Sequence, residues 1–305
     1  MAFWNRRKPG PEKARRKGEE PAAPLMRTVE PEPEDVRPSA APAAKDTPFV
    51  MPKRLLSYEV GNMQGVGSRQ RQEDSFAFIN AVDVSAMKKE GLCAIVADGM
   101  GGMRDGRIAS ETAIASLRWD LAAMSRKGDI PSQMKEAVLN AGAKVFEALE
   151  GDGGSTVVLC LFYDEQFYFV SVGDSYLFLL RDGALLRLNE EHNVQEREYL
   201  KTINGGSMNP AAARANEEAA ALTSFLGMDE IEYIDVLKKP LKIHNGDVFL
   251  LCSDGVGGVI SEEKIRECLT LGTPQEMCHA MEEAVLEKQE PYQDNYTALV
   301  VRCGY

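Results

Sequence analysis

The sequence predicts an α+β domain, because short strand-like segments alternate with segments of helical periodicity. The strand-like segments are rich in β-branched, aromatic and aliphatic residues and are bounded by turn residues. Two pairs of them are joined only by residues 163–165 and 181–183, a spacing that antiparallel hairpins alone can use. Other segments repeat apolar residues every three or four positions. One α+β domain with an at least partly antiparallel sheet is therefore expected.

The predicted elements follow one another along the chain. Buried strands are expected at 92–97, 155–162, 166–172, 175–180, 247–252 and 296–302, and a further strand begins at Ser75. Apolar residues at positions 134, 138, 141, 145 and 149 predict a helix over 131–150. Thr273 to Glu276 form a capping box with proline at the first helical position, which predicts a helix running to about residue 289. A helix with Ile108, Ala109, Ala113 and Leu117 on one face is expected after the glycines at 99–102.

Composition excludes several classes of protein. The net charge of −12 over 305 residues argues against nonspecific nucleic-acid binding, which depends on cationic side chains. The chain contains no apolar run of about 18 residues and no apolar stretch near its start, so neither a membrane span nor a secretory signal is expected. The six cysteines form no C-x-x-C pair and are predicted to be buried thiols of a reducing compartment. The expected location is cytoplasmic.

Residues 1–52 are predicted to be a disordered tail, and residues 53–305 the folded domain. Ten of the 15 prolines lie in the tail, interleaved with alanine and glutamate. Such a composition buries too little apolar surface to offset the entropy of ordering. Its basic groups at 6–8 and 15–17 could contact an acidic partner or an anionic membrane, although a solubilising leader is the simpler interpretation.

Four acidic residues stand at the ends of predicted strands. Asp98 and Asp254 follow strongly apolar strands, Asp254 after one serine, while Asp74 and Asp294 precede strands. If these strand ends converge, the like charges repel at low dielectric unless a cation lies among them. Carboxylates and carbonyls are ligands that Mg²⁺ and Mn²⁺ accept. Taken singly, each acid is more simply a turn or capping residue.

Other phosphate chemistries lack their motifs. No cysteine is followed by an arginine at the spacing of a cysteine-nucleophile phosphatase loop, and there is no Asp-x-Asp of an aspartyl-phosphate mechanism. The Gly-Lys-Ser/Thr of a phosphate-binding P-loop is also missing. With three scattered histidines and no paired cysteines, a zinc site of Cys and His is not expected either, so any metal must be held by oxygen.

Seven motifs together resemble the ordered series of the metal-dependent protein phosphatases (PPM, type 2C) in their bacterial form. They are RQRQED (69–74), VADGMGG (96–102), GST (154–156), VGDS (172–175), LTSFLG (222–227), CSDG (252–255) and DN (294–295). The resemblance covers about residues 57–302. It implies a four-layer αββα sandwich, in which two mainly antiparallel β-sheets are flanked by helices. It also implies two Mn²⁺ or Mg²⁺ ions at one edge, with a third, weaker ion as a further option.

The resemblance assigns metal ligands residue by residue. Asp98 matches the carboxylate that bridges the two metals, and Gly99 matches the residue that lends its backbone carbonyl. Asp254 and Asp294 fall where the family places ligands of the second metal. Asp98, Asp254 and Asp294 are therefore the expected catalytic set.

Four further residues match positions around the metals. Glu73 and Asp74 correspond to the acidic pair that holds water at the site, and Asp174 to the acid linked to the third metal. Arg69 sits where a basic side chain grips the substrate phosphate through paired hydrogen bonds. Arg71 is expected to be an ordinary surface arginine.

The chain departs from the family pattern in places that are not metal ligands. Tyr176 replaces the usual arginine after Gly-Asp-Ser. Gly257 and Gly258 replace a more polar pair and are expected to loosen their loop. Residues 191–221 stand where the family has a mobile flap, which is expected to influence substrate choice. His192 in this segment is interpreted as a structural, hydrogen-bonded histidine.

The resemblance implies an enzyme of signalling, which hydrolyses phosphoserine and phosphothreonine in proteins with a metal-activated water. Its expected partners are phosphorylated proteins, the products of a serine/threonine kinase. Two alternatives stay open. The substitutions at Met103 and Tyr176 would suit a catalytically silent phosphatase-like binding module. The substrate could instead be a small phosphorylated metabolite.

Overall fold

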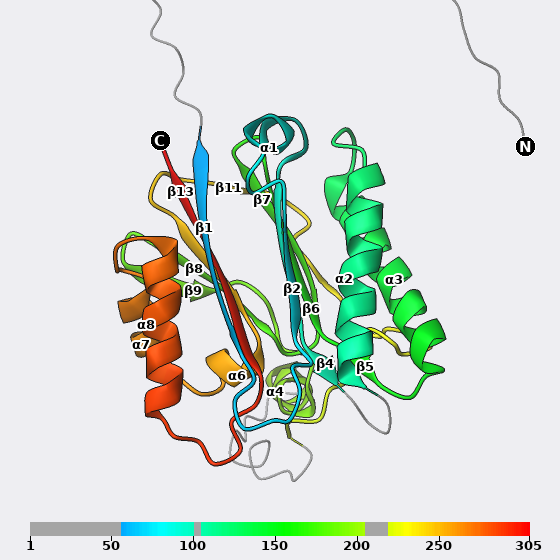
Figure 1. The fold of residues 1–305 in the computed structure, drawn as a ribbon. Helices are drawn as coiled ribbons and strands as arrows, with labels where there is room; N and C mark the ends of the chain where they lie inside the picture. The colour runs from blue at the N-terminus through cyan, green and yellow to red at the C-terminus, as the bar shows by residue number, and fades with distance from the viewer. Residues whose placement is uncertain (1–55, 101–104, 205–218) are drawn as a thin grey trace, which may run out of the picture. The chain divides into compact units, whose positions relative to one another are not determined.

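A computed structural model describes residues 56–100, 105–204 and 219–305, which all belong to the unit Pro52–Tyr305. In this unit two β-sheets lie face to face and helices cover the outer face of each (Figure 1). The predicted α+β sandwich with flanking helices is confirmed. The tail predicted over residues 1–52 lies outside the described residues and stays a prediction.

Every strand pairing among the described residues is antiparallel. The first sheet has the order β1 (Ser57–Gly65), β13 (Tyr296–Gly304), β12 (Val248–Cys252), β8 (Tyr176–Arg181) and β9 (Ala184–Arg187). The second has the order β10 (Asp235–Val236), β7 (Gln166–Val172), β6 (Val157–Tyr163), β3 (Leu92–Ala97) and β2 (Ser75–Ile79), with β11 (Leu241–Lys242) also paired to β7. A short pair, β4 (Gly99–Met100) and β5 (Gly154–Ser155), stands beside them.

The two predicted hairpins are confirmed, and their turns have the backbone that suits twisted strands. Asp164 and Glu165, between β6 and β7, have φ of 51° and 60°. Asp182 and Gly183, between β8 and β9, have φ of 51° and 79°. Two consecutive left-handed residues form the type of turn whose twist matches that of the flanking strands.

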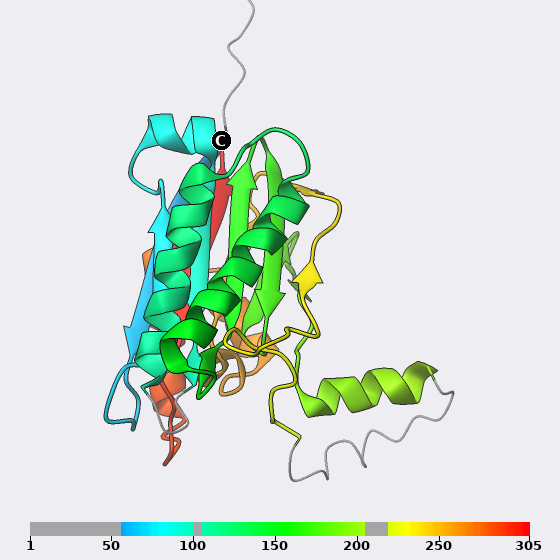
Figure 2. The ribbon, with the colours of Figure 1, turned by 90° about the vertical axis from the view of Figure 1, so that its right-hand side faces the viewer.

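Three apolar cores separate the layers. The middle core, between the sheets, is centred on Phe162, Phe167 and Phe249, whose ring centroids lie 4.3–5.1 Å apart. Helices α2 (Gly106–Ala123) and α3 (Ile130–Leu149) cover the second sheet, as Figure 2 shows, and α7 (Glu262–Cys268) and α8 (Pro274–Glu287) cover the first. Strands buried on both faces explain the continuous apolar runs of the sequence.

The three predicted helices are present, and the prediction was wrong for one of their residues. α3 and α8 have the expected bounds to within two residues, and the capping box at Thr273 and Glu276 is present. In α2, Ala109, Ala113 and Leu117 are buried as expected, but Ile108 is 42% exposed. The prediction for Ile108 was wrong because it lies one position before the buried row, which continues through Ala109. The described part of the chain also contains α1 (Val84–Glu90), α4 (Val194–Asn204) and α6 (Asp254–Gly257), which were not predicted.

All six cysteines are buried and unpaired, as predicted. Burial raises the pKa of the Cys93 thiol to about 12, so it is protonated at neutral pH. Among the described helices, none combines the length and apolar character needed to cross a bilayer.

Candidate metal and phosphate site

The antiparallel register brings the ends of several strands to one edge of the sandwich. Ser75 pairs with Ala97, and Cys252 pairs with both Tyr176 and Ala298. The acidic residues next to these positions therefore share that edge, near α6 at the bottom of Figure 1. They are Asp74, Asp98, Asp174, Asp254 and Asp294.

Hydrogen bonds fix the backbone of Asp98 where β3 ends. Its N–H donates to Thr156 Oγ1 at 3.1 Å, and its carbonyl accepts from Thr156 N–H at 2.8 Å and from Ser155 Oγ at 3.0 Å. Thr156 Oγ1 also lies 2.7 Å from Ser175 Oγ, beside Asp174. These bonds tie Asp98 to the β7–β8 connection, which carries Asp174.

Asp74 bridges the two sheets. Its side chain is almost fully buried, and Oδ2 accepts from Ser253 Oγ at 2.8 Å and Thr297 Oγ1 at 2.7 Å. Its other oxygen, Oδ1, is buried without a hydrogen-bond partner. Burial raises the pKa of Asp74 to about 6, against the two hydroxyl bonds, which lower it, and Asp254 nearby adds to the rise.

The acids at this edge raise one another's pKa. Burial, followed by the charges of Asp74, Asp254, Asp174 and Asp294, holds the pKa of Asp98 well above its usual range. Burial and Asp294 raise the pKa of Asp254. Burial raises that of Asp174 to about 7, with Asp254 and then Glu191 contributing. Asp98 therefore lies where negative charges are concentrated and water is scarce, which is where a cation is most strongly stabilised.

The donor set suits a hard divalent cation in its chemistry. It consists of carboxylate oxygens, and one oxygen each of Asp74 and Asp254 is buried without a partner. Among the residues described, no three or more His, Cys, Asp or Glu side chains are close enough together to hold a metal ion as they stand. Asp294 accepts from Arg69 Nη2 at 2.5 Å and from the N–H of Asn295 at 2.7 Å.

Gly99 lies where no side chain fits. A Cβ atom there would be 2.1 Å from the carbonyl oxygen of Gly106 and 2.6 Å from that of Glu73. The Glu73 carboxylate in turn accepts from the N–H of Gly106 at 3.2 Å, at the start of α2. The backbone after Asp98 is thus packed against both Glu73 and the first turn of α2.

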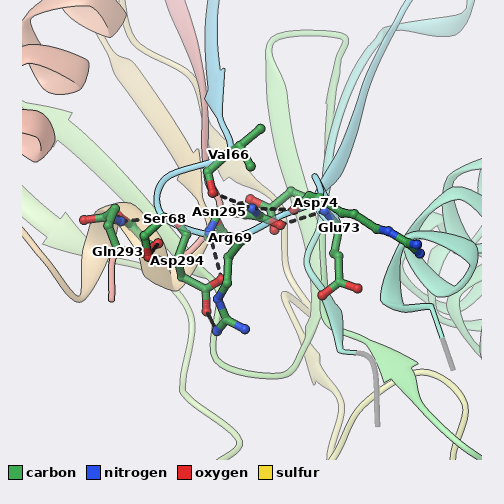
Figure 3. Close-up of polar contacts among 11 residues, drawn as sticks. Val66, Ser68, Arg69, Glu73, Asp74, Gln293, Asp294 and Asn295 are labelled. Atoms are coloured by element: carbon green, nitrogen blue, oxygen red, sulfur yellow. Dashed lines mark hydrogen bonds and ion pairs between the residues drawn. The ribbon is translucent and has the colours of Figure 1, made fainter. Parts of the chain in front are cut away.

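Asn295 fastens the loop that carries Arg69 and Glu73 (Figure 3). Its side-chain amide donates to the carbonyls of Val66 at 2.8 Å and Arg71 at 3.0 Å, and its Oδ1 accepts from Glu73 N–H at 2.6 Å. The side chain is nearly fully buried. Three backbone groups of one loop therefore depend on a single amide.

The two arginines of this loop differ as expected. Arg69 points to the same side of the loop as Asp294 and Glu73, and it pairs with Asp294 (Figure 3). Arg71 is 70% exposed and pairs with Asp105 at 3.1 Å. Arg69 is the arginine directed toward the acids.

His192 is a hydrogen-bonded, structural histidine, as interpreted from the sequence. Its backbone N–H donates to the carbonyl of Gly173 at 2.9 Å, and its ring Nδ1 accepts from the backbone N–H of Gly173 at 3.1 Å. Burial lowers its pKa to about 4, so the ring is neutral at pH 7. The histidine thereby fixes the backbone just before Asp174.

Replacing His192 by asparagine is expected to reduce the acid sensitivity of the metal-free protein. A histidine with a lowered pKa in the folded state contributes stability above about pH 6.5, and that contribution is lost as pH falls toward 4. Asparagine keeps an acceptor for Gly173 but does not titrate. The loss of unfolding free energy between pH 7 and 4 should be smaller by about 2 kcal/mol, measured by urea denaturation with chelator present. If the free energy of unfolding fell equally with pH in the two proteins, the neutral, buried state of the His192 ring would be contradicted.

A groove of about 700 Å³ opens at this edge. Asp174 and Tyr176 line it together with Asp254 and Asp294. Five residues of the expected flap also line it, namely Glu191, Asn193, Gln195, Ala219 and Ala220. The flap segment includes α4, which the structure describes, whereas its residues 205–218 lie outside the described residues, as does Met103.

Several residues of the site were not assigned a role from the sequence. Ser253 and Thr297 hold Asp74, and Thr156 holds Asp98. Asn295 holds the loop of Arg69. A signal was present, because Thr156, Ser253 and Asn295 belong to the motif series and Thr297 follows it closely. Their hydrogen-bond partners, however, lie in segments that are distant in the sequence.

Comparison with known proteins agrees with this geometry. A sequence profile described as protein phosphatase 2C matches residues 67–289. The serine/threonine protein phosphatase PstP of Mycobacterium tuberculosis is 30% identical over 213 residues, which are 67% of this chain and 39% of PstP. The serine/threonine phosphatase stp of Listeria monocytogenes is 28% identical over 217 residues, 68% of this chain and 82% of stp.

A solved structure is also similar. The catalytic domain of PstP in complex with two manganese ions aligns with a TM-score of 0.65 and 25% identity, over 82% of this chain and all of that domain. The chain thus spans about two fifths of the full-length mycobacterial relative, but its match covers that catalytic domain.

Proposed function

The chain belongs to the protein phosphatase 2C family, and from this premise we propose that it hydrolyses phosphoserine and phosphothreonine in proteins. The observation that carries the proposal is the convergence of five aspartates, with Arg69 beside them, at one edge of the sandwich. Its substrates are proposed to be phosphoproteins produced by a serine/threonine kinase in a signalling role. Six buried, unpaired thiols support a reducing compartment such as the cytoplasm.

The proposed cofactor is a pair of Mn²⁺ or Mg²⁺ ions. When bound, such a pair lowers the pKa of water and neutralises charge on the phosphoryl oxygens. The residues proposed to hold it are Asp98, Gly99, Asp254 and Asp294, with Glu73 and Asp74 orienting water and Asp174 serving a third, weaker ion. The manganese bound to the related PstP domain supports this choice.

The chain's own residues supply the remaining parts of the mechanism. Arg69 is placed to bind two phosphoryl oxygens through its guanidinium, which positions the phosphate next to the acids. Asp74 is held in one orientation by Ser253 and Thr297, so that its free Oδ1 keeps a fixed direction. Preorganised groups of this kind need little rearrangement during the reaction.

The proposal predicts that the protein releases phosphate from a phosphothreonine peptide in the presence of Mn²⁺. Phosphate release should stop when a chelator is added. Phosphate release is measured with a colorimetric assay, and isothermal titration measures Mn²⁺ uptake. Turnover of a small phosphorylated metabolite in preference to the peptide would favour the metabolite alternative. Absence of turnover of any phosphopeptide or aryl phosphate by the metal-supplemented protein would contradict the proposal. Absence of saturable metal uptake would favour the silent module.

Replacing Arg69 by alanine is expected to raise the KM for the phosphopeptide about 10-fold, with a smaller effect on kcat, because a phosphate contact is lost. Arg69 also engages Asp294. Its removal should therefore lower the Mn²⁺ concentration that gives half-maximal activity. Steady-state kinetics at varied peptide and Mn²⁺ concentrations measure both effects.

The matched control is Arg71→Ala, in the same loop but paired with Asp105 on the surface. It should leave KM and the Mn²⁺ dependence within about 2-fold of the wild type. Equal effects of the two substitutions would mean that Arg69 has no special role.

A further inference from the structure

Tyr176 fills the space between α6 and the side chain of Arg187. A Cβ atom on Gly257 would lie 2.5 Å from the Tyr176 ring, so the ring packs directly on the glycine backbone of α6. On its other side, Arg187 Cζ lies 4.1 Å from the ring centroid, the geometry of a cation–π contact. Gly257 therefore does not loosen the loop, as the sequence suggested, but makes room for the tyrosine.

Arg187 is the cation that lies beside Tyr176. Arg187 lies on β9 opposite Phe178 of β8, and Tyr176 is two residues before Phe178, so it lies on the same face. Nη1 of Arg187 donates to Glu191 at 2.5 Å. Its Nε and Nη2 are buried without hydrogen-bond partners, so the guanidinium is held by the ring of Tyr176 and by Glu191.

The contacts continue from Arg187 to α4. The second carboxylate oxygen of Glu191 accepts from Asn193 Nδ2 at 2.5 Å. Oδ1 of Asn193 accepts from the N–H of Glu196 at 2.8 Å, in the first turn of α4. A continuous series of contacts thus joins α6, which begins with Asp254, to the N-terminus of α4.

Both ends of this series contribute to the lining of the groove. Glu191, Asn193 and residue 195 line it from the segment that leads into α4. Asp254 and residues 258–259 line it from the α6 segment, and Tyr176 is itself a lining residue. A groove of about 700 Å³ is larger than a phosphate group and has room for the residues that flank it in a peptide.

We propose that Tyr176 and Arg187 are positioning residues. They hold the α4 and α6 segments that line this groove at the spacing that admits the peptide around the phosphorylated residue. The inference rests on the proposed function, because it takes a phosphopeptide as the occupant. Neither residue touches the reacting atoms. Their effect is on the binding of the peptide and not on the hydrolysis of the phosphate ester itself.

The test compares Arg187→Ala with the wild type on two substrates, a phosphothreonine peptide of about ten residues and p-nitrophenyl phosphate. The peptide spans the groove, whereas the aryl phosphate occupies only its metal end. We expect kcat/KM for the peptide to fall about 10-fold or more, mainly through KM, and that for the aryl phosphate to fall by less than about 3-fold. A ratio of the two values that stays at the wild-type level would overturn the inference.

A matched control is Arg302→Ala. Arg302 is also a partly exposed strand arginine paired with one glutamate, Glu59 on β1, but it lies toward the far end of the sandwich from the acids. This variant should lose some thermal stability and keep the wild-type ratio of peptide to aryl phosphate turnover. If the ratio of peptide to aryl phosphate turnover fell in both variants, general destabilisation would explain the effect of Arg187→Ala.

Two further variants address the ring. Tyr176→Phe retains the stacking surface for Arg187 and Gly257 and should keep the wild-type ratio, whereas Tyr176→Ala should reproduce the effect of Arg187→Ala. The effects of Tyr176→Ala and Arg187→Ala should be less than additive in the double variant, because they interrupt one series of contacts.

Hydrogen exchange gives a readout that needs no turnover. Amides of α4 and α6 should exchange faster together in Arg187→Ala and should be unchanged in Arg302→Ala. Unchanged exchange in both helices would overturn the positioning role even if the protein hydrolysed neither substrate. Absence of turnover by the wild type, in contrast, would count against the proposed function and leave the exchange test decisive for the groove.

Discussion

Replacing Asp98 by asparagine is expected to lower kcat/KM for phosphate release by about 10³-fold or more and, at the same time, to make the metal-free protein more stable. Activity falls because the central carboxylate of the proposed metal site is lost. Stability rises because desolvation, and after it the charges of four neighbouring acids, hold the pKa of Asp98 well above its usual range. An aspartate with a raised pKa in the folded state stabilises the fold at low pH, and this contribution is lost as pH rises through that pKa.

Asparagine has the same shape but carries no charge, so it avoids this loss near pH 7. We expect a gain of about 2 kcal/mol in the free energy of unfolding, measured by urea denaturation with chelator at pH 7.5. The difference from the wild type should shrink at pH 4. Stabilisation by added Mn²⁺, seen as a rise in Tm of the wild type, should be absent from the variant.

Asp182→Asn is the control for this experiment. Asp182 is exposed in the left-handed β8–β9 turn, which asparagine also tolerates, at the opposite edge from the acids. It should leave activity, metal-free stability and the Mn²⁺ effect unchanged. If Asp98→Asn destabilised the metal-free protein, the proposed repulsion among the five acids would be wrong.

Replacing Asn295 by alanine is expected to have the second-largest effect, a fall of about 100-fold in kcat/KM together with a loss of about 3 kcal/mol of stability. The substitution leaves the carbonyls of Val66 and Arg71 and the N–H of Glu73 without their partner. Each unmade bond of this kind costs about 1 kcal/mol. The loop then no longer holds Arg69 and Glu73 in place, and a small misplacement of such groups costs much of the rate.

Asn80→Ala separates loss of stability from loss of position. Asn80 follows β2 at the end away from the acids, has φ of 66°, and donates to the carbonyl of Gly91 at 2.9 Å. Its replacement should lower the stability, measured by thermal unfolding, while kcat/KM at 20 °C stays near that of the wild type. A similar loss of activity in both variants would mean that Asn295 acts only through overall stability.

Prediction from the sequence succeeded where the local pattern reports burial. The strands at 92–97 and 166–172 have the bounds expected for them, because both faces of each are covered and the apolar run is unbroken. The strand Ser57–Gly65 was not predicted. It lies at a sheet edge, alternates exposed and buried residues, and gains its hydrogen bonds from β13, almost 240 residues later in the chain.

The site shows the same division. The acids at strand ends were recognised from their positions after or before apolar runs, and the structure brings Asp98, Asp254 and Asp294 to one edge. The partners that orient them were not recognised. Tyr176 and Gly257 were noted as two separate departures, yet in the folded chain they are in contact.

By itself, the sequence determined which segments are apolar enough to be buried and which acids end them, because burial periodicity is a local property of the chain. Only the tertiary structure decided which of these ends are neighbours, since strand register pairs residues that are far apart in sequence. It alone placed Asn295 against the loop of Arg69, and Arg187 against Tyr176. Hydrogen bonds and ring contacts act over a few ångströms, so their partners are set by the packing of the sheets and not by spacing along the chain.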